Sequence, residues 1–365
     1  MKIAILGTRG VPPSYGGFET FVAELGTRLA RRGHDVTVYC RRISNLESRI
    51  SNWNGIHCIE VPFVKGKYFE TVTHTLRSAL HVGDVDVVLV CNAANAFTIP
   101  LLQLRRIPVA INVDGIERRR RKWNALARSF YAMGEALAAT FADRVIADAE
   151  VIADYYYASF GVECDVISYG SDFPKESDTD ILPRLGVEPQ NYILYVSRFE
   201  PENNPLEVVL AYEKVRNAPP LVMVGDAVYA KVLLGELHKH ESDKVLFPGA
   251  LYGADYRTLQ RNALMYIQAT EVGGTHPALI EAMGSGGCVV ANDTPENREV
   301  GGDAVRYFRL DPEETLSDEV RVLLAQPGLR ELLRERARRR ARERYTWDAV
   351  TDRYELLFQE LTKRH

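Results

Sequence analysis

The chain has 365 residues, a length that fits two domains of ordinary size. Its 46% hydrophobic and 26% charged residues indicate a globular protein with a large core, and its net charge of −4 argues against bulk electrostatic binding of nucleic acid. No stretch reaches the roughly 18 apolar residues of a membrane span, the five cysteines form no C-x-x-C pair, and a strand-like segment stands where a signal peptide would. We therefore expect a cytoplasmic protein.

The first half of the chain begins with a βαβ pattern. We expect a buried strand at residues 3–6, a glycine-containing loop at 7–17, a helix at 18–32 and a second strand at 36–40. This order indicates a doubly wound parallel sheet in an α/β fold. The glycines of the loop lack the G-x-G-x-x-G spacing of dinucleotide-binding folds, which argues against a nicotinamide enzyme.

The alternation of strands and helices continues to residue 170. A long amphipathic helix is expected at 123–141, and further strands at 85–91, 109–113, 145–146 and 166–167. Residues 171–188 are polar and contain two prolines, which indicates a linker.

The second half repeats the alternation. Its strands are expected at 192–197, 221–224, 245–247, 264–268 and 288–291. Residues 330–363 have a helical pattern in which arginines and glutamates alternate, and this favours a solvated helix face over a nucleic-acid patch. Two α/β halves would place a ligand cleft between the carboxyl ends of their sheets.

The stretch Thr270–Gly286, T-E-V-G-G-T-H-P-A-L-I-E-A-M-G-S-G, combines a glycine turn with the start of a helix. Thr275 is expected as the N-cap and Pro277 in the first turn, where a missing N–H is tolerated. Free amides and the helix dipole favour an anion there, and Glu281 lies about one turn inside the helix, within reach of ligand hydroxyls. This arrangement suits a nucleotide sugar. The alternative is an ordinary strand-loop-helix unit.

Three motifs together are similar to those of a known family. Gly16-Gly17-Phe18-Glu19 follows the first strand, Ser197-Arg198 follows the first strand of the second half, and G-G-T-H-P-A-L-I-E-A-M lies near residue 280. They resemble the motifs of the GT-B glycosyltransferases of family 4, and the resemblance covers essentially the whole chain. A narrower set, including V-D-G-I-E and S-R-F-E-P-E-N-N, resembles bacterial rhamnosyltransferases that assemble cell-wall and capsular polysaccharides.

The resemblance implies a fold of two Rossmann-like, doubly wound parallel-sheet domains that face each other across a cleft. It implies an acceptor-binding domain at 1–170, a linker at 171–188 and a nucleotide-sugar-binding domain at 189–345. The C-terminal helix, 346–365, would pack back on the first domain. The implied reaction transfers a sugar with retention of its anomeric configuration and without a covalent enzyme intermediate.

The donor site implied by the resemblance lies mainly in the second half. Arg198 would stabilise the charge of the leaving diphosphate, and Glu281 would bind the ribose; both are candidate catalytic residues. For His276, contact with the diphosphate and a structural polar contact are both open. The implied donor-binding residues are Gly16, Gly17, Arg198, Asn203, Glu271, Gly273, Gly274, Thr275, His276 and Glu281.

Two positions depart from the family pattern. Gly273 stands where the family has a glutamate that touches the donor sugar, and the neighbouring Glu271 is a candidate replacement. Asn203 stands in place of a phosphate-binding lysine, so that Arg198 and the helix N-terminus would carry more of the diphosphate charge. A 6-deoxy sugar makes fewer polar contacts and is compatible with both changes.

The acceptor site is expected at the carboxyl edge of the first domain. Asp114 and Glu117 follow a strand that ends at Val113, and either could orient or deprotonate the acceptor hydroxyl, with Asp114 preferred as the catalytic residue. The alternative for Asp114-Gly115 is a simple turn. The implied acceptor-binding residues are Tyr15, Phe18, Glu19, Asp114 and Glu117.

The run Arg118–Lys122, followed by Trp123, stands out in a chain of negative net charge. Either this run is a solvated loop, or it holds a lipid diphosphate or anionic headgroups. In the second case we expect salt-sensitive peripheral association with the inner face of the cell membrane.

No metal or other cofactor is expected, because neither the D-x-D pair at Asp84 and Asp86 nor that at Asp178 and Asp180 lies at the exit of a strand. The leading hypothesis is transfer of L-rhamnose from dTDP-rhamnose to a saccharide hydroxyl of a polyprenyl-diphosphate-linked acceptor. Two alternatives remain open. One keeps the fold with a UDP- or GDP-hexose donor, and the other is a nucleotide-sugar-binding protein without catalysis.

Overall fold

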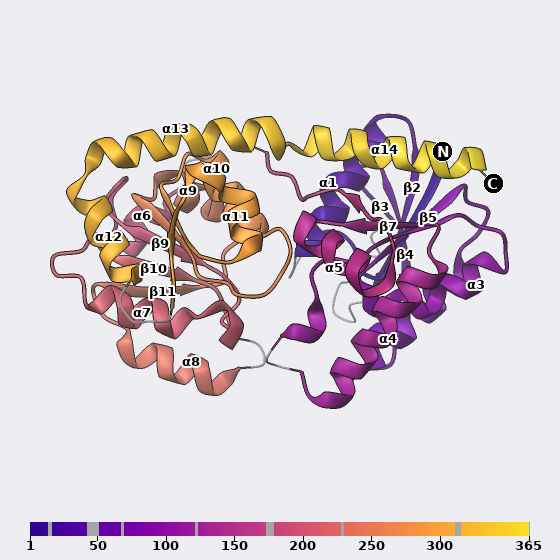
Figure 1. Ribbon diagram of the computed structural model, residues 1–365, viewed down its shortest axis with the longest axis horizontal. Helices are drawn as coiled ribbons and strands as arrows, with labels where there is room; N and C mark the ends of the chain where they lie inside the picture. Colours follow the sequence, from indigo (N-terminus) through magenta and orange to yellow (C-terminus); the bar gives the residue numbers. More distant parts are fainter. Residues whose placement is uncertain are drawn as a thin grey trace. The chain divides into compact units, whose positions relative to one another are not determined.

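The chain forms two compact units. The computed structural model describes residues 1–13, 17–41, 51–66, 69–120, 123–172, 179–227, 230–310 and 315–364. The first unit consists of Met1–Arg119, Trp123–Gly170 and Trp347–His365, and the second of Arg120–Lys122 and Ser171–Thr346 (Figure 1).

The first unit is built on an eight-stranded sheet of order β3-β4-β2-β1-β5-β6-β7-β8. Among the strand pairings of the residues that the structure describes, β3–β4 alone is antiparallel. Ile3 of the central strand pairs in register with Val36 on one side and Val87 on the other. The strands are β1 (Lys2–Leu6), β2 (Asp35–Arg41), β3 (Asn52–Trp53), β4 (Ile56–Val61), β5 (Val87–Cys91), β6 (Val109–Asn112), β7 (Arg144–Ala147) and β8 (Asp165–Val166).

Helices cover this sheet and pack on it through apolar side chains. Every residue of β5 is buried, as expected for a central parallel strand. The helical segments are α1 (Gly17–Arg31), α2 (Phe69–His81), η1 (Ala93–Thr98), α3 (Ile99–Gln103), η2 (Glu117–Arg119), α4 (Ala125–Phe141), α5 (Glu150–Phe160) and α14 (Trp347–Arg364).

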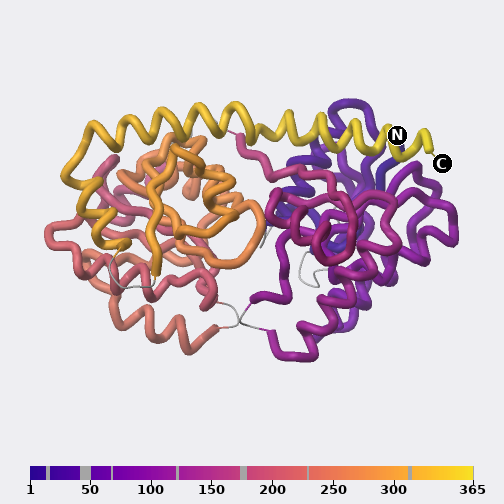
Figure 2. The backbone as a smooth tube through the Cα atoms, viewed as in Figure 1, coloured from indigo at the N-terminus to yellow at the C-terminus, as the bar shows by residue number. Residues whose placement is uncertain are grey.

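The last helix, α14, belongs to the first unit and lies beside α1 (Figure 2). The ring of Phe21 on α1 lies 6.3 Å from that of Trp347 and 5.3 Å from that of Tyr354. Arg32 of α1 adds an ion pair of 2.7 Å with Glu355. The apolar stripe of α14 is therefore buried against a helix from the other end of the chain.

The second unit has a fully parallel six-stranded sheet of order β11-β10-β9-β12-β13-β14. Its strands are β9 (Ile193–Val196), β10 (Leu221–Val224), β11 (Val245–Gly249), β12 (Met265–Gln268), β13 (Val289–Asn292) and β14 (Arg306–Phe308). Two doubly wound parallel sheets are therefore present, and the predicted pair of Rossmann-like domains is confirmed.

Helices of the second unit begin inside the predicted linker. Ile181 and Leu182 of α6 are buried, so residues 181–185 form part of the domain where the sequence predicted a linker. The helical segments are α6 (Ile181–Leu185), η3 (Pro201–Asn203), α7 (Pro205–Glu213), α8 (Lys231–Leu237), η4 (His238–His240), α9 (Gly253–Asn262), α10 (Pro277–Gly284), α11 (Pro295–Gly301), η5 (Gly302–Ala304), α12 (Thr315–Ala325) and α13 (Pro327–Arg344).

The arginine-rich helix α13 docks on the second unit through several of its arginines. Arg334 donates to the carbonyl oxygen of Leu264 at 2.9 Å, and Arg340 donates to that of Val300 at 2.6 Å. These guanidinium groups satisfy carbonyls at the ends of other elements. The prediction of a solvated face is therefore wrong for Arg334 and Arg340. A long arginine side chain can bury its aliphatic part while its guanidinium group binds backbone carbonyls.

Candidate active site

The central strands of the second sheet form its switch point. The chain runs from β9 outward through β10 to β11 and then returns to β12 on the other side of β9. At such a point the loops after the two central strands diverge, and ligands of α/β folds bind there. Residues 197–204 follow β9, and residues 269–276 follow β12.

Two hydrogen bonds connect these two loops, and a third shapes the loop after β9. The side chain of Asn204 donates to the carbonyl of Ala269 at 2.8 Å, and the amide of Glu271 donates to the carbonyl of Glu202 at 2.9 Å. The side chain of Asn203 donates to the carbonyl of Arg198 at 2.7 Å. Asn203 is buried, and its amide group therefore supports the loop that carries Arg198.

Helix α10 begins one residue later than the sequence predicted. His276, with an extended backbone (φ −93°, ψ 108°), is the N-cap, and Pro277 occupies the first turn as expected. Thr275 is buried and precedes the cap, so its predicted role as N-cap is wrong. Gly274 is also buried beside it. At the start of α10, Pro277 has no N–H, and the amide of Leu279 donates to the carbonyl of the N-cap His276 at 3.0 Å.

Gly273 and His276 occupy adjoining space. A Cβ atom added at Gly273 would lie 2.5 Å from Cε1 of His276. A glutamate at position 273 would therefore displace the imidazole ring. The glycine that replaces the family's glutamate at position 273 therefore leaves the space that the ring of His276 occupies.

The imidazole of His276 is held in its neutral form. Burial, together with the guanidinium of Arg120, lowers the pKa of His276 to about 4. Its Nε2 atom is buried and has no hydrogen-bond partner within the described part of the chain. At neutral pH this side chain therefore offers a hydrogen-bond donor or acceptor and no charge.

Glu281 is half-buried on α10 and is oriented by a tyrosine. The hydroxyl of Tyr256 donates to its carboxylate, and Tyr256 in turn accepts from the side chain of Gln260 at 2.7 Å. Burial, and then the charge of Glu281, raises the pKa of Tyr256 well above its usual value. Tyr256 thus stays a hydrogen-bond donor and holds the carboxylate in one orientation.

Charged residues surround the loop after β9. Arg198 is 40% exposed in its side chain, with Glu200 at 3.9 Å. Glu202 is fully buried, and Arg120, which belongs to the second unit, lies 3.7 Å from it and 3.6 Å from Glu200. The sequence analysis missed Glu202, and it considered Arg120 only within the basic run 118–122 and not beside this loop. Their pairing joins residues far apart in the chain, so only the E-P-E-N-N motif could have drawn attention to Glu202.

The first sheet has its switch point between β1 and β5. Gly7 follows β1 with a φ of +95°, and a Cβ added there would lie 2.4 Å from the carbonyl oxygen of Cys91. Only glycine fits this close approach. Glu19 of α1 accepts from the amide of Arg9 at 3.1 Å, so this predicted acceptor residue holds the loop after β1.

Asp114 lies at the end of β6 in a network that reaches α14. Its backbone has a φ of +57°, and its amide donates to Oδ1 of Asn112 at 2.9 Å. Nδ2 of Asn112 donates to the hydroxyl of Tyr354 at 2.7 Å, and the hydroxyl of Tyr169 donates to Oδ1 of Asp114 at 3.2 Å. The side chain and the backbone amide of Asp114 are thus both held by hydrogen bonds, and its role as the catalytic base stays a prediction.

The remaining predicted acceptor residues lie on the same unit. Phe18 packs edge-on against Tyr169, with ring centroids 6.4 Å apart. Glu117 accepts from Nε1 of Trp123 at 3.5 Å. Gly17 is the first residue of α1, whereas Tyr15 and Gly16 lie outside the described residues.

Two family models of glycosyltransferases match the chain. The model described as the glycosyl transferase 4-like domain matches residues 16–170, and the one described as glycosyl transferases group 1 matches residues 178–340. The chain is a GT-B glycosyltransferase. A comparison with curated protein sequences finds no match.

Solved structures share the fold of this glycosyltransferase over their whole length. Sucrose-phosphate synthase from Thermosynechococcus elongatus is 18% identical, with 100% of both chains covered and a TM-score of 0.85. Anabaena HepE, in complex with UDP-glucose, is 16% identical over 98% of this chain and 99% of its own, with a TM-score of 0.81. The UDP-forming trehalose-phosphate synthase of Burkholderia vietnamiensis is 9% identical over 98% and 99%, with a TM-score of 0.74.

In the glycosyltransferase, no group of three His, Cys, Asp or Glu side chains that could hold a metal occurs within the described residues. Asp84 pairs with Nζ of Lys2 at 2.7 Å, and Asp86 accepts from the amide of Lys2 at the same distance. Asp178 lies outside the described residues. Metal independence stays a prediction.

Proposed function

We propose that this glycosyltransferase moves L-rhamnose from dTDP-rhamnose to a hydroxyl of a lipid-linked saccharide, with retention of configuration, in the synthesis of a polysaccharide. The observation that supports this most strongly is the second unit's switch point. There a half-exposed arginine, the start of α10 and the carboxylate of Glu281 follow two adjacent strands. Cation, amide donors and carboxylate are the groups that a nucleoside diphosphate with its ribose requires.

The donor diphosphate is assigned to Arg198 and the first amides of α10. When the bond between the sugar C1 and the phosphate oxygen breaks, negative charge develops on the leaving diphosphate. A guanidinium and helix-end amides stabilise that charge without reorganising. Neutral His276 supplies a further hydrogen bond beside them, because its low pKa keeps the ring uncharged.

The sugar and ribose ends of the donor are assigned to opposite sides of the same loop. Glu281, oriented by Tyr256, accepts hydrogen bonds from the ribose hydroxyls. Glu271 lies next to Gly273, where the ring of His276 takes the space that a glutamate would need. A 6-deoxy sugar has one hydroxyl fewer to satisfy and suits a site with an imidazole at this position.

The acceptor is assigned to the first unit, around Asp114. Its carboxylate accepts the proton of the acceptor hydroxyl while the acceptor oxygen forms the new bond to C1 and the diphosphate leaves. Asn112 and Tyr169 hold the carboxylate and its backbone in place. Catalysis would occur on the cytoplasmic side, with the protein peripherally attached to the membrane; no helix within the described residues is long and apolar enough to span a bilayer.

A second candidate donor is a UDP-hexose. It is favoured by the solved structures of similar fold, among them HepE in complex with UDP-glucose and a UDP-forming synthase. The two candidates share the diphosphate and ribose contacts and differ in the base and the sugar. A protein that binds the donor without transferring it would share the same contacts and show no turnover.

The test begins with a thermal-shift panel of dTDP, UDP and GDP. A ligand that binds only the folded state stabilises it by about 2.7 kcal/mol at a hundredfold excess over its Kd. Preference for dTDP supports rhamnose, and preference for UDP supports the second candidate. Transfer to a polyprenyl-diphosphate-linked saccharide then distinguishes enzyme from binder. Absence of stabilisation by all three nucleotides would overturn the donor-site assignment.

A further inference from the structure

We propose that Arg120 supplies a second cation to the donor diphosphate site. Asn203 stands where the family has a phosphate-binding lysine, and its side chain donates instead to the carbonyl of Arg198 at 2.7 Å. Arg120 comes from another part of the chain, between two segments of the first unit, and belongs to the second unit. The inference rests on the proposed function for the identity of the anion. It adds to that function a residue that the motifs did not indicate.

Arg120 and Arg198 converge on one carboxylate oxygen. Nη1 of Arg120 lies 3.6 Å from Oε2 of Glu200, and Nη2 of Arg198 lies 3.9 Å from the same atom. The side chain of Arg120 is 11% exposed and that of Arg198 is 40% exposed. Two guanidinium groups directed at one anionic oxygen create a position where negative charge is favoured. A diphosphate oxygen carries the same kind of charge and is held by the same two groups.

The start of α10 lies within electrostatic reach of Arg120. After burial, the guanidinium of Arg120 is the second cause of the lowered pKa of His276, the N-cap of that helix. The two loops are also joined here, because the amide of Glu271 donates to the carbonyl of Glu202, whose carboxylate lies 3.7 Å from Arg120. Arg120 is therefore near both elements to which the diphosphate is assigned, the loop after β9 and the first turn of α10.

Glu202 holds the guanidinium of Arg120 in place. The side chain of Glu202 is 0% exposed, and neither carboxylate oxygen has a hydrogen-bond partner within the described part of the chain. A buried carboxylate without hydrogen bonds requires a neighbouring cation, and Arg120 provides it. The two glutamates of the loop therefore differ in their roles. Glu202 positions Arg120, whereas Glu200, which both arginines face, competes with the diphosphate for them.

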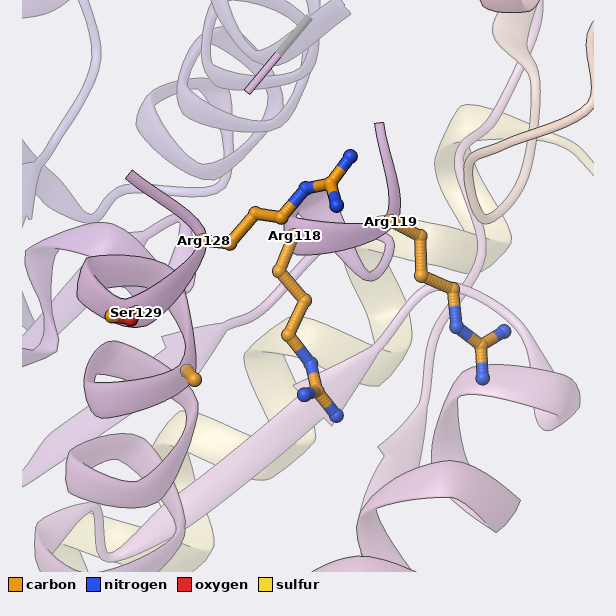
Figure 3. Close-up of a pocket in the computed structure, with 5 residues that line it drawn as sticks. Arg118, Arg119, Arg128 and Ser129 are labelled. Carbon is orange, nitrogen blue, oxygen red and sulfur yellow. The ribbon is translucent and has the colours of Figure 1, made fainter. Parts of the chain in front are cut away.

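The neighbouring arginines of the basic run are engaged elsewhere. Arg118 and Arg119 both lie over the ring of Tyr155, with their guanidinium carbons 5.4 Å and 5.5 Å from its centroid. They line an open hollow on the first unit (Figure 3). Residues 121–122 lie outside the described residues. Among the described residues of the run, Arg120 alone belongs to the second unit and faces its switch point.

The test is calorimetric titration of the full chain with UDP and with dTDP. In Arg120→Gln, the Kd of the nucleotide is expected to rise roughly thirtyfold, because a charge-assisted hydrogen bond to phosphate is lost. Arg120→Lys keeps the charge and is expected to show a smaller rise. Glu200→Gln removes the competing negative charge with little change in the shape of the side chain, and is expected to lower the Kd.

Further variants separate nucleotide binding from folding. Arg120→Gln alone leaves the buried carboxylate of Glu202 without its cation and is expected to lower the unfolding midpoint of the ligand-free chain. Arg120→Gln/Glu202→Gln removes both charges, and is expected to recover that midpoint without recovering the affinity for the nucleotide. Arg216→Gln changes an exposed arginine of the same unit and is expected to match wild type in both measurements.

Wild-type affinity in Arg120→Gln, an equal loss in Arg120→Lys, or weaker binding in Glu200→Gln would overturn the inference. Recovery of both stability and nucleotide affinity in the double variant would also overturn it, because Arg120 would then form a structural ion pair only. The proposed donor site is judged on wild type and on Arg198→Ala. If wild type binds neither nucleotide, that site is wrong and the inference falls with it. If Arg198→Ala loses affinity and Arg120→Gln does not, the site stands and the role of Arg120 is wrong.

Discussion

At the switch point of the second unit, charged and polar side chains gather before α10. At that of the first unit, Asp114 is hydrogen-bonded to a tyrosine and an asparagine. Arg198 is half-exposed beside Glu200, and Glu281 is held by Tyr256. Asp114, by contrast, accepts one hydrogen bond from Tyr169 and is linked through Asn112 to α14. The same architecture thus presents a cation and a helix N-terminus at one switch point and a hydrogen-bonded carboxylate at the other.

This difference teaches how one fold divides a transfer reaction. A diphosphate needs cations and amides that remain accessible, so its site tolerates exposure. A residue that takes a proton needs a fixed orientation, which buried partners provide. We expect substitutions at the switch point of the second unit to lower donor binding, and substitutions at that of the first unit to lower turnover with donor binding intact.

The largest effect is expected for Asp114→Ala. Loss of a proton acceptor lowers turnover by about a thousandfold, and the thermal shift with dTDP or UDP stays at the wild-type value. Turnover is followed as product formed from a labelled donor. Asp84→Ala, an exposed aspartate of the same unit, serves as the control. Equal loss of the nucleotide shift would contradict the division between the units.

Arg198→Ala is expected to lower turnover by roughly a hundredfold, because one group that stabilises the leaving charge is lost. The nucleotide shift also decreases, in contrast to Asp114→Ala. Arg184→Ala removes an exposed arginine of the same unit and is expected to have no effect. Wild-type kinetics in Arg198→Ala would remove this residue from the diphosphate site.

Acid is expected to destabilise the second unit through His276. The pKa of His276 in the folded chain, about 4, lies below the usual value of 6.5. As the pH falls, the unfolded chain therefore binds a proton at this residue before the folded chain does. The contribution to the free energy of unfolding is complete above pH 6.5 and falls by about 3 kcal/mol by pH 4. Urea unfolding at pH 7 and pH 5 measures the loss. In His276→Gln, this contribution to the difference in unfolding free energy between pH 7 and pH 5 should disappear. If that difference were the same as in wild type, the ring of His276 would be solvated in the folded protein.

Glu281→Gln is expected to raise the KM for the donor about tenfold and to change kcat less, because ribose contacts bind ground state and transition state alike. Tyr256→Phe removes the hydroxyl that orients the carboxylate of Glu281 and should give a smaller increase in the KM for the donor. A decrease in kcat alone would assign Glu281 to the chemical step.

The smallest effect is expected for Tyr354→Phe. Removing the hydroxyl that accepts from Asn112 costs about 1 kcal/mol of unfolding free energy, measured by urea titration. Tyr157→Phe, at an exposed tyrosine, is the control. Reduced turnover with an unchanged nucleotide shift would show that α14 positions Asp114; turnover equal to wild type would show that it only stabilises the unit.

Much of the fold could be predicted because its signals are local. Continuous apolar runs such as 87–91 and 193–196 became central strands, and Pro277 marked the first turn of α10 within one residue. The helix start itself was misplaced at Thr275, since a threonine is a good cap by propensity and only the loop's path decides where the helix begins.

The sequence motifs indicated which residues lie at the candidate site, but they did not indicate which atoms those residues contact. Arg198 and Glu281 were chosen by motif, and both lie at the switch point. Glu202 and its buried pairing with Arg120 had no signal in the spacing of residues. Asn203 was chosen as a donor contact, yet its side chain binds the carbonyl of Arg198.

The sequence by itself determined the two parallel sheets, the glycine turn before α10 and the membership in the glycosyltransferases. The sheets and the turn follow from apolar periodicity and turn chemistry among neighbouring residues, whereas the membership follows from the resemblance of the motifs and from the two family models. Only the tertiary structure decided that Gly273 leaves room for the ring of His276, that Tyr354 reaches Asn112, and that arginines of α13 bind backbone carbonyls. The physical reason is that such contacts depend on which distant segments packing brings within hydrogen-bond distance, and no local pattern records that choice.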